Sequence, residues 1–139
     1  MKNEKKTPVS KIMSNDIITV NKTQSIREVS DIIEDKNIRH VPVVSGDKVI
    51  GMLSKVDLQK ISFVNSYDND GLTTAMYDNL NIEQVMTKDV KVVQKSDTIY
   101  EVATILSKNE FHSLPVVEEE RLVGIVTTTD LIKYLVDQY

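Results

Sequence analysis

The sequence predicts a mixed α/β fold, made of two β-α-β-β-α repeats that pack about a pseudo-twofold axis. Three observations lead to this prediction. The chain repeats itself, each copy alternates short β-branched runs with amphipathic stretches, and one copy of about 53 residues buries too little surface to fold alone. The two copies are therefore expected to share one folded body.

A shift of 73 residues reveals the repeat. Residues 9–61 then align with residues 82–134 without a gap. The identical pairs, such as Gly51 with Gly124, fall on turn formers and apolar positions, where chance matches would not concentrate. We predict four segments: an N-terminal tail at 1–8, a first repeat at 9–61, a linker at 62–81 and a second repeat at 82–139.

Each repeat begins with a β-branched strand, at 17–20 or 90–93, followed by an amphipathic helix. Ser25-Ile26-Arg27-Glu28 and Thr98-Ile99-Tyr100-Glu101 both have the pattern of a capping box, with a hydroxyl at the N-cap and a carboxylate three residues later. The linker is polar, with a loop expected at 67–71 and a short helix around 72–77.

Two further strands follow each helix, at 41–44 and 49–53 and at 114–117 and 122–126. The first strand of each repeat should pair in parallel with the strand after the helix, and the hairpin strand should be antiparallel. Proline in a strand indicates an edge position or a strand beginning. The turn at 45–48 has hairpin chemistry, whereas the turn at 118–121 is merely polar. Second helices should begin near Ser54 and Thr127.

Composition excludes several classes of protein. The 139 residues include no Cys and two His, so neither a thiol nucleophile nor a three-histidine metal site is available. No apolar run exceeds five residues, which predicts no membrane span, and the basic start is not followed by an apolar stretch. We expect a cytoplasmic protein that is not an enzyme.

The net charge of −4 is unevenly distributed along the chain. Residues 1–61 carry 11 basic and 8 acidic side chains, residues 62–81 carry 0 and 3, and residues 82–139 carry 6 and 10. A protein that binds nucleic acid through its whole surface would need a positive balance. The short basic stretch from Lys2 to Lys6 is a weak candidate for such binding, and the first repeat is a better place for a local anion site.

The sequence resembles the CBS domain family, whose tandem pairs are called Bateman modules. The resemblance rests on four motifs and covers both repeats. They are Ile38-Arg39-His40-Val41-Pro42-Val43-Val44, Gly51-Met52-Leu53-Ser54-Lys55-Val56-Asp57-Leu58, Phe111-His112-Ser113-Leu114-Pro115-Val116-Val117 and Gly124-Ile125-Val126-Thr127-Thr128-Thr129-Asp130-Leu131. The resemblance implies a regulatory module that binds AMP, ADP, ATP or a related adenosyl ligand in clefts between the repeats.

The resemblance also implies which residues bind. Asp57 and Asp130 would hold ribose hydroxyls, with help from Ser54 and Thr127, because a carboxylate is an acceptor suited to a vicinal diol. A nearby helix N-terminus offers free N–H groups to a phosphate. The other residues expected to line the two clefts are Ile18, Ile38, Arg39, His40, Met52, Lys91, Phe111, His112, Ser113 and Ile125.

Each candidate also has a purely structural interpretation. Ser54-x-x-Asp57 and Thr127-x-x-Asp130 are ordinary helix caps, and one residue can cap a helix and bind a ligand. Arg39, His40 and His112 are also compatible with solvated positions at a strand start. The three glutamates at 118–120 are typical of a solvated turn.

The two clefts should differ in their preference for phosphate. Arg39, His40 and Lys55 surround Asp57, whereas Ser113 and Thr128 stand at the positions of His40 and Lys55 in the second repeat. Charge-assisted contacts are the stronger ones, so a polyphosphate should prefer the Asp57 cleft.

The resemblance implies a sensor without a required cofactor, which signals through a homodimer or an unidentified effector protein. The alternative is a structural or protein-interaction module with empty clefts. The intact Ser/Thr and Asp positions in both repeats favour the first hypothesis.

Overall fold

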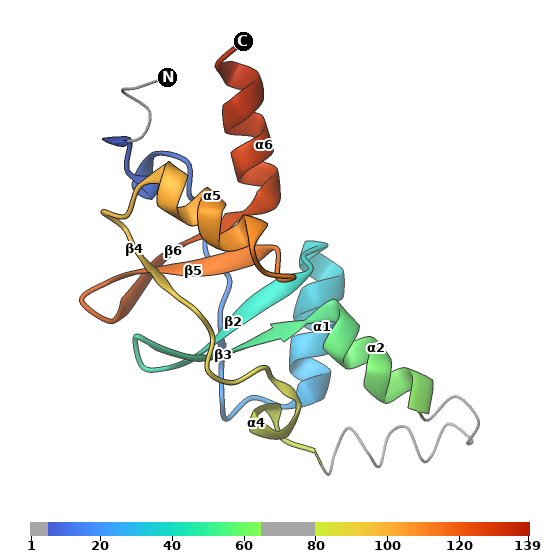
Figure 1. The fold of residues 1–139 in the computed structure, drawn as a ribbon. Coiled ribbons are helices and arrows are strands. Elements are labelled where there is room, and N and C mark those ends of the chain that lie inside the picture. Colours follow the sequence, from blue (N-terminus) through green and yellow to red (C-terminus); the bar gives the residue numbers. More distant parts are fainter. Residues whose placement is uncertain (1–5, 65–79) are drawn as a thin grey trace. The chain divides into compact units, whose positions relative to one another are not determined.

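The computed structural model describes residues 6–64 and 80–139, and its fold is drawn in Figure 1. The chain divides into two compact units. The first unit is Ile18–Val90, and the second unit joins Met1–Ile17 to Lys91–Tyr139. The tail before residue 6, the loop expected at 67–71 and the helix expected around 72–77 lie outside the described residues.

Both units share the order β-α-β-β-α, which a short helix follows in the first unit and a 3₁₀ turn precedes in the second. The first unit contains β1 (Val20–Asn21), α1 (Ile26–Lys36), β2 (His40–Ser45), β3 (Lys48–Ser54), α2 (Lys55–Val64) and α4 (Ile82–Val85). The second unit contains the 3₁₀ turn η2 (Val9–Lys11), β4 (Val93–Gln94), α5 (Ile99–Ser107), β5 (Ser113–Glu118), β6 (Arg121–Thr127) and α6 (Thr128–Asp137).

The strand pairing confirms the predicted mixed α/β class. In the first unit β1 pairs with β2 in parallel and β2 with β3 antiparallel, and β4, β5 and β6 repeat this arrangement in the second unit. The opening strands are shorter and later than predicted from the β-branched runs, because only Val20 and Asn21 lie in register with the next strand. In the second unit the same is true of Val93 and Gln94.

The proline in each hairpin lies near a strand beginning, which was one of the two predicted positions. β2 is flanked on both sides, so it is not an edge strand of its unit. Pro42 precedes Val43, where pairing with β1 begins, and therefore its missing N–H interrupts no bond of the parallel ladder. Pro115 has the same position before Val116 in β5.

Helix caps form where the sequence predicts them. Ser25 and Glu28 make a reciprocal capping box at the start of α1, and Thr98 accepts a hydrogen bond from the N–H of Glu101 at the start of α5. These bonds satisfy N–H groups that have no partner inside the helix. Behind each cap an apolar stripe is buried, with Ile26, Val29 and Ile33 as its members in α1.

Each repeat contributes its opening segment to the other repeat's unit. The N–H of Val9 donates to the Asp97 carbonyl at 2.7 Å, and Val9 is fully buried in the core of the second unit. The equivalent segment at 80–86 packs on the first unit, where Ile82 is fully buried. The boundaries of sequence repeats and of compact units therefore differ by this exchange.

Both hairpins have two-residue turns, including the one that the sequence predicts only as polar. Ser45 pairs with Lys48 across the first turn, and Glu118 pairs with Arg121 across the second. The second turn places Glu119 and Glu120 at φ of 52° and 74°. A left-handed conformation at both central residues is typical of a type I′ turn, in which Asn and Gly are usual and Glu is unusual.

Candidate functional site

The candidate site of the first unit is built where β3 passes directly into α2. Ser54 ends the strand, and its Oγ accepts a hydrogen bond from the N–H of Asp57 at 3.0 Å. Asp57 Oδ2 in turn accepts from the N–H of Ser54 at 3.0 Å. Both residues are half-buried, and within the described part of the chain Asp57 Oδ1 has no hydrogen-bond partner. One carboxylate oxygen thus fixes the helix start, while the other is free to accept from a ligand.

The second unit contains the same constellation at the junction of β6 and α6. Thr127 Oγ1 accepts from the N–H of Asp130 at 3.2 Å, and Asp130 Oδ2 accepts from the N–H of Thr127 at 2.8 Å. Both residues are again half-buried. The predicted caps are therefore confirmed in both units, with matching geometry.

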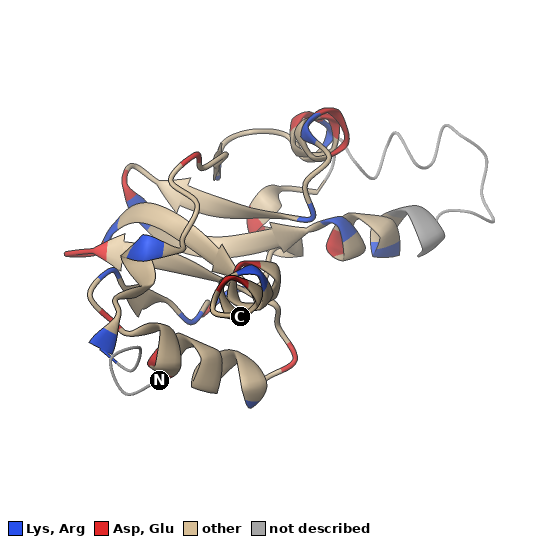
Figure 2. Cartoon of the chain, turned by 90° about the horizontal axis from the view of Figure 1, so that it is seen from above, with Lys and Arg blue, Asp and Glu red and all other residues tan. Residues whose placement is uncertain are grey.

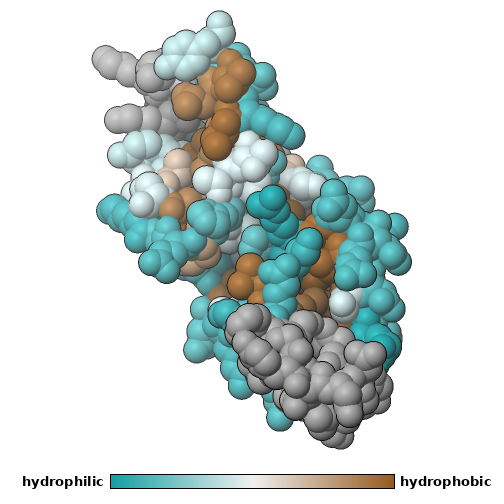
Figure 3. Space-filling view, turned by 90° about the vertical axis from the view of Figure 1, so that its right-hand side faces the viewer, coloured by the Kyte–Doolittle hydropathy of each residue, from teal (hydrophilic) through white to brown (hydrophobic). Residues whose placement is uncertain are grey.

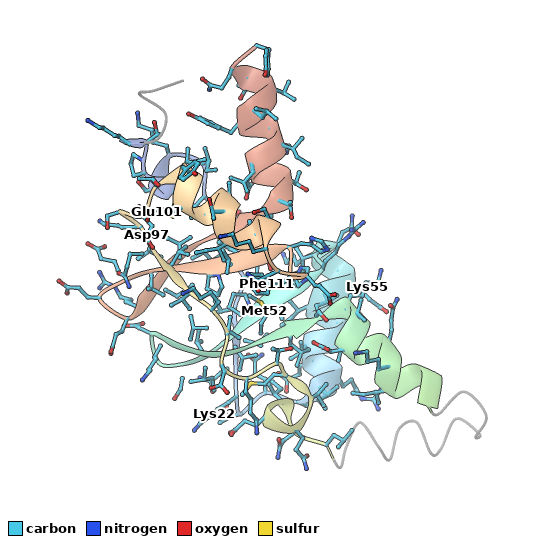
Figure 4. The ribbon with its side chains drawn as sticks, viewed as in Figure 1. Lys22, Met52, Lys55, Asp97, Glu101 and Phe111 are labelled. Carbon is cyan, nitrogen blue, oxygen red and sulfur yellow. The ribbon has the colours of Figure 1, made fainter. Side chains whose placement is uncertain are left out.

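The start of the preceding strand lies beside each cap. His40 is the register partner of Ser54, and Ser113 is the register partner of Thr127. In the first unit the N–H of Lys55 donates to the Arg39 carbonyl at 2.8 Å. This bond places two exposed cationic residues next to the Ser54–Asp57 cap (Figure 4 labels Lys55).

The corresponding junction of the second unit has neither Lys nor Arg at the equivalent positions, which are occupied by His112 and Thr128. Thr128 donates to the His112 carbonyl through its backbone N–H at 2.9 Å and through its Oγ1 at 3.0 Å. The hydroxyl that stands at the position of the Lys55 side chain is thus committed to the protein itself. The two caps are alike in geometry but differ in the charge beside them.

Two of the predicted lining residues have their backbones fully engaged. The N–H and carbonyl of Met52 pair with Thr87, at 3.0 and 2.8 Å. Ile125 pairs in the same way with Ser14, at 3.1 and 2.8 Å. The backbone groups of Met52 and Ile125 are therefore occupied, and the side chain of Met52 is buried. In the sequence, only the repeated Met13 and Met86 beside Ser14 and Thr87 hint at these partners.

The remaining predicted residues are distributed between the units. Ile18, Ile38 and Arg39 belong to the first unit, and Lys91, Phe111 and His112 belong to the second. Lys91, His112 and Phe111 are exposed, Phe111 by 39%, whereas Ser113 is buried. Each cap thus has its own unit's residues around it, and the clefts shared by the two repeats stay a prediction.

Charges elsewhere are mixed in sign. Figure 2 shows both acidic and basic positions on several of the helices. Across residues 6–64 and 80–139, no group of three or more His, Asp or Glu side chains could hold a metal ion. The same residues contain no helix that is long and apolar enough to cross a membrane.

Both repeats match the model of one protein family. The model of the CBS domain family matches residues 9–63 and again residues 82–137. These matches cover well over half of the sequence, so the chain belongs to the CBS domain family.

Individual relatives cover the same region. Homoserine O-acetyltransferase of Methanohalobium evestigatum is 31% identical over 131 residues, which are 93% of this chain and 24% of the acetyltransferase. The chain therefore spans about a quarter of that relative's length.

Two solved structures share the fold. The CBS domain pair of protein MJ0100, in complex with 5′-methylthioadenosine and S-adenosyl-L-methionine, is 28% identical, with a TM-score of 0.77 over 96% of this chain and 98% of that chain. CBSX2 in complex with AMP is 20% identical, with a TM-score of 0.80 over 95% of this chain and 98% of that chain.

Proposed function

We propose that this chain is a regulatory module that senses an adenosyl ligand at the Asp57 and Asp130 caps. The observation that carries the proposal is the duplicated cap, in which one carboxylate oxygen holds the helix start and the other has no hydrogen-bond partner among the residues that the structure describes. A carboxylate in that state is suited to accept from both hydroxyls of a ribose. MJ0100 and CBSX2, which bind adenosine derivatives in their solved structures, support this ligand class.

The regulatory effect follows from differential binding. A ligand that binds one arrangement of the two repeats more tightly shifts the population toward that arrangement. A homodimer partner or a separate effector protein would read this shift. In this proposal the ligand is a signal and the chain performs no catalysis.

Ligand binding is tested first by thermal unfolding and calorimetry. The intact chain is titrated with AMP, ADP, ATP, 5′-methylthioadenosine and S-adenosylmethionine. A ligand present at 100 times its Kd should stabilise the protein by about 2.7 kcal/mol. Stabilisation by at least one of them is expected, and no response to any would favour the structural module with empty clefts.

Asp57→Asn and Asp130→Asn locate the binding. Asn keeps a side-chain oxygen that can cap the helix, but it loses the negative charge and half of the acceptor capacity. Each substitution should weaken adenosyl binding at its own cap by at least tenfold. Glu28→Gln is the matched control, because it changes the same kind of capping residue at the start of α1, away from the site. Equal loss of ligand affinity in the control would contradict the proposal.

We further propose that phosphorylated ligands prefer the Asp57 cap. The exposed cations Arg39 and Lys55 lie beside it, whereas His112 and Thr128 occupy the equivalent positions in the second unit. Lys55→Thr should weaken ATP binding more than 5′-methylthioadenosine binding, because only ATP carries phosphates. Thr128→Lys is the reciprocal variant, and equal effects of Lys55→Thr on both ligands would refute the preference.

A further inference from the structure

The opening segment of each repeat places a methionine sulfur against a glycine. Met13 lies against Gly124 of β6, and Met86 lies against Gly51 of β3. In both cases Sδ is the atom that an added Cβ would meet first, at 2.5 Å for Gly124. The two methionines are also equivalent in the 73-residue shift. The same thioether contact therefore recurs in both units.

A pair of backbone hydrogen bonds follows directly after each methionine. The N–H of Ser14 donates to the Ile125 carbonyl at 2.8 Å, and the N–H of Ile125 donates to the Ser14 carbonyl at 3.1 Å. Thr87 and Met52 form the same pair in the first unit, at 2.8 and 3.0 Å. We call these two pairs the second-unit bridge and the first-unit bridge. Each thioether contact thus lies beside the bridge that holds its segment on the strand.

Both methionine side chains are partly buried. Met86 packs against the core of the first unit, and Met13 packs against the core of the second. A partly buried thioether is in apolar contact on one side and can be reached by a small oxidant on the other. Met52 provides the contrast, since it is only 8% exposed in β3 (Figure 4).

Sulfur distinguishes these two side chains from other apolar groups at the surface. Figure 3 shows apolar side chains near the C-terminal end of α6, at the top of the view, and Ile132, Leu135 and Val136 of this helix are exposed. Their saturated carbons do not react with dilute peroxide, whereas a thioether does. Exposure of Met13 and Met86 therefore has a chemical consequence that exposure of the aliphatic residues does not have.

Hydrogen peroxide converts a thioether to a sulfoxide without any further reactant. A lone pair of the sulfur attacks one peroxide oxygen, and an S–O bond forms as the O–O bond breaks. The departing oxygen takes the proton of the transferred oxygen and leaves as water. Sulfur is oxidised by two electrons, and the peroxide is reduced by two. The side chain keeps its carbon skeleton but gains a polar oxygen.

A sulfoxide does not fit the contact that the thioether makes. Its oxygen is a hydrogen-bond acceptor, and the two N–H groups of the neighbouring bridge already donate to carbonyls. Either the oxygen stays against the glycine without a donor, or the side chain turns toward water and leaves the glycine. Both outcomes weaken the packing of the opening segment on its strand.

We propose that Met13 and Met86 are modification sites, which peroxides oxidise to the sulfoxide and which methionine sulfoxide reductases restore. Oxidation of each residue loosens the bridge of its own unit. The bridges lie two residues before Ser54 and Thr127, which begin the caps, so the loosened strand is the one that carries the candidate site. The oxidation itself is independent of the proposed ligand.

Tandem mass spectrometry of the full chain, sampled during exposure to dilute hydrogen peroxide, measures the oxidation rate of each methionine. Met13 and Met86 should be oxidised at least about fivefold faster than Met52, because susceptibility to oxidation follows exposure. A rate for Met52 that equals or exceeds that of either residue would overturn the assignment.

Amide hydrogen exchange of the oxidised chain, followed by NMR, measures the state of the bridges. The amides of Ser14, Ile125, Met52 and Thr87 should exchange at least about tenfold faster after oxidation. Treatment with methionine sulfoxide reductases and a thiol reductant should restore the native rates. Unchanged exchange after complete oxidation, or no recovery after reduction, would refute the proposal.

Met13→Leu and Met86→Leu are matched controls for each other. Leucine keeps a similar apolar volume but has no sulfur to oxidise. After peroxide treatment, Met13→Leu should retain slow exchange at the second-unit bridge and lose it at the first-unit bridge, and Met86→Leu should give the reverse. The double variant should not respond to peroxide, although it keeps Met52. Equal acceleration of both bridges in either single variant would show that a different group reacts.

Discussion

At the residue scale, Gly51 and Gly124 permit an exchanged segment to lie close against a strand. A Cβ added to Gly124 would lie 2.5 Å from Met13 Sδ and 3.0 Å from the Ser14 carbonyl oxygen. Gly51 has the equivalent environment, formed by Met86 and the Thr87 carbonyl. Each glycine therefore leaves room for one methionine of the exchanged segment, and both the glycine and the methionine recur in the second repeat of the sequence.

Gly124→Ala should lower the free energy of unfolding by about 1–3 kcal/mol, because Met13 and the backbone of Ser14 must shift to admit the methyl group. Chemical denaturation of the full chain measures this loss. In a Met13→Ala background the same substitution should cost less, because the closest atom is gone. If the two substitutions change the free energy of unfolding additively, Met13 is not the residue that the added methyl group contacts.

The ion pair between Lys95 and Glu118 makes the free energy of unfolding depend on pH. Lys95 Nζ donates to Glu118 Oε1 at 2.9 Å, and this hydrogen bond lowers the pKa of Glu118. A carboxyl whose pKa is lower in the folded than in the unfolded state stabilises the fold above the unfolded pKa, and this contribution is lost as the pH falls through the folded pKa.

The difference in unfolding free energy between the native chain and Lys95→Met should therefore be largest near pH 7 and should disappear as the pH falls through the lowered pKa of the folded Glu118 carboxyl. Denaturant titrations at several pH values measure it. Lys88→Met, which removes an exposed lysine without a salt bridge in the described chain, should show no such trend. A constant difference at every pH would exclude the ion pair as its cause.

At the scale of elements, the second hairpin is held in an unfavourable turn. Glu119 and Glu120 both have positive φ, which costs non-glycine residues about 1 kcal/mol or more. Glu119→Asn with Glu120→Gly supplies the residues that a type I′ turn prefers.

This double substitution should raise the free energy of unfolding by about 1 kcal/mol, measured by denaturant titration. Glu110→Asn controls for the loss of acidic charge, because Glu110 is exposed in a loop and is not among the residues with positive φ. It removes one carboxylate where the double substitution removes two. If the control gives half of the stabilisation or more, charge and not turn geometry is responsible.

Local signals explain which elements the sequence could predict. Ser25 and Glu28 predict a cap because the bonds of a capping box join residues three positions apart. The sequence predicts a turn at 118–121 but not its left-handed conformation at Glu119 and Glu120, since the pairing of the flanking strands imposes that backbone against the preference of its residues. The length of β1 could not be predicted for the same reason, because it depends on pairing with Val43 and Val44, which are distant in the sequence.

At the scale of the whole molecule, the boundaries of the sequence repeats differ from the boundaries of the compact units. The 73-residue shift identifies two repeats, and the CBS domain model matches residues 9–63 and 82–137. The exchange of opening segments was not predicted, because it depends on hydrogen bonds such as that from Ile99 to the Thr7 carbonyl, far away in the sequence. Likewise the sequence predicts both caps of the candidate site, but not the partners that occupy the backbones of Met52 and Ile125.

The exchange predicts which fragment of the chain folds by itself. The unit Ile18–Val90 is continuous and contains Ile82, which is fully buried in its core, and Met52 with its partner Thr87. A fragment of residues 18–90 should therefore unfold cooperatively, although with less stability than the full chain because of its small size. A fragment of residues 9–61 is the sequence repeat. It contains Val9 but not the core of the second unit in which Val9 is buried, and it lacks Ile82 of its own core. This fragment should therefore show no cooperative transition. Circular dichroism during urea titration measures both, and a fragment of residues 18–79 is the control that removes only the exchanged segment. If 9–61 unfolds as cooperatively as 18–90, the exchanged segment is not part of the folding unit.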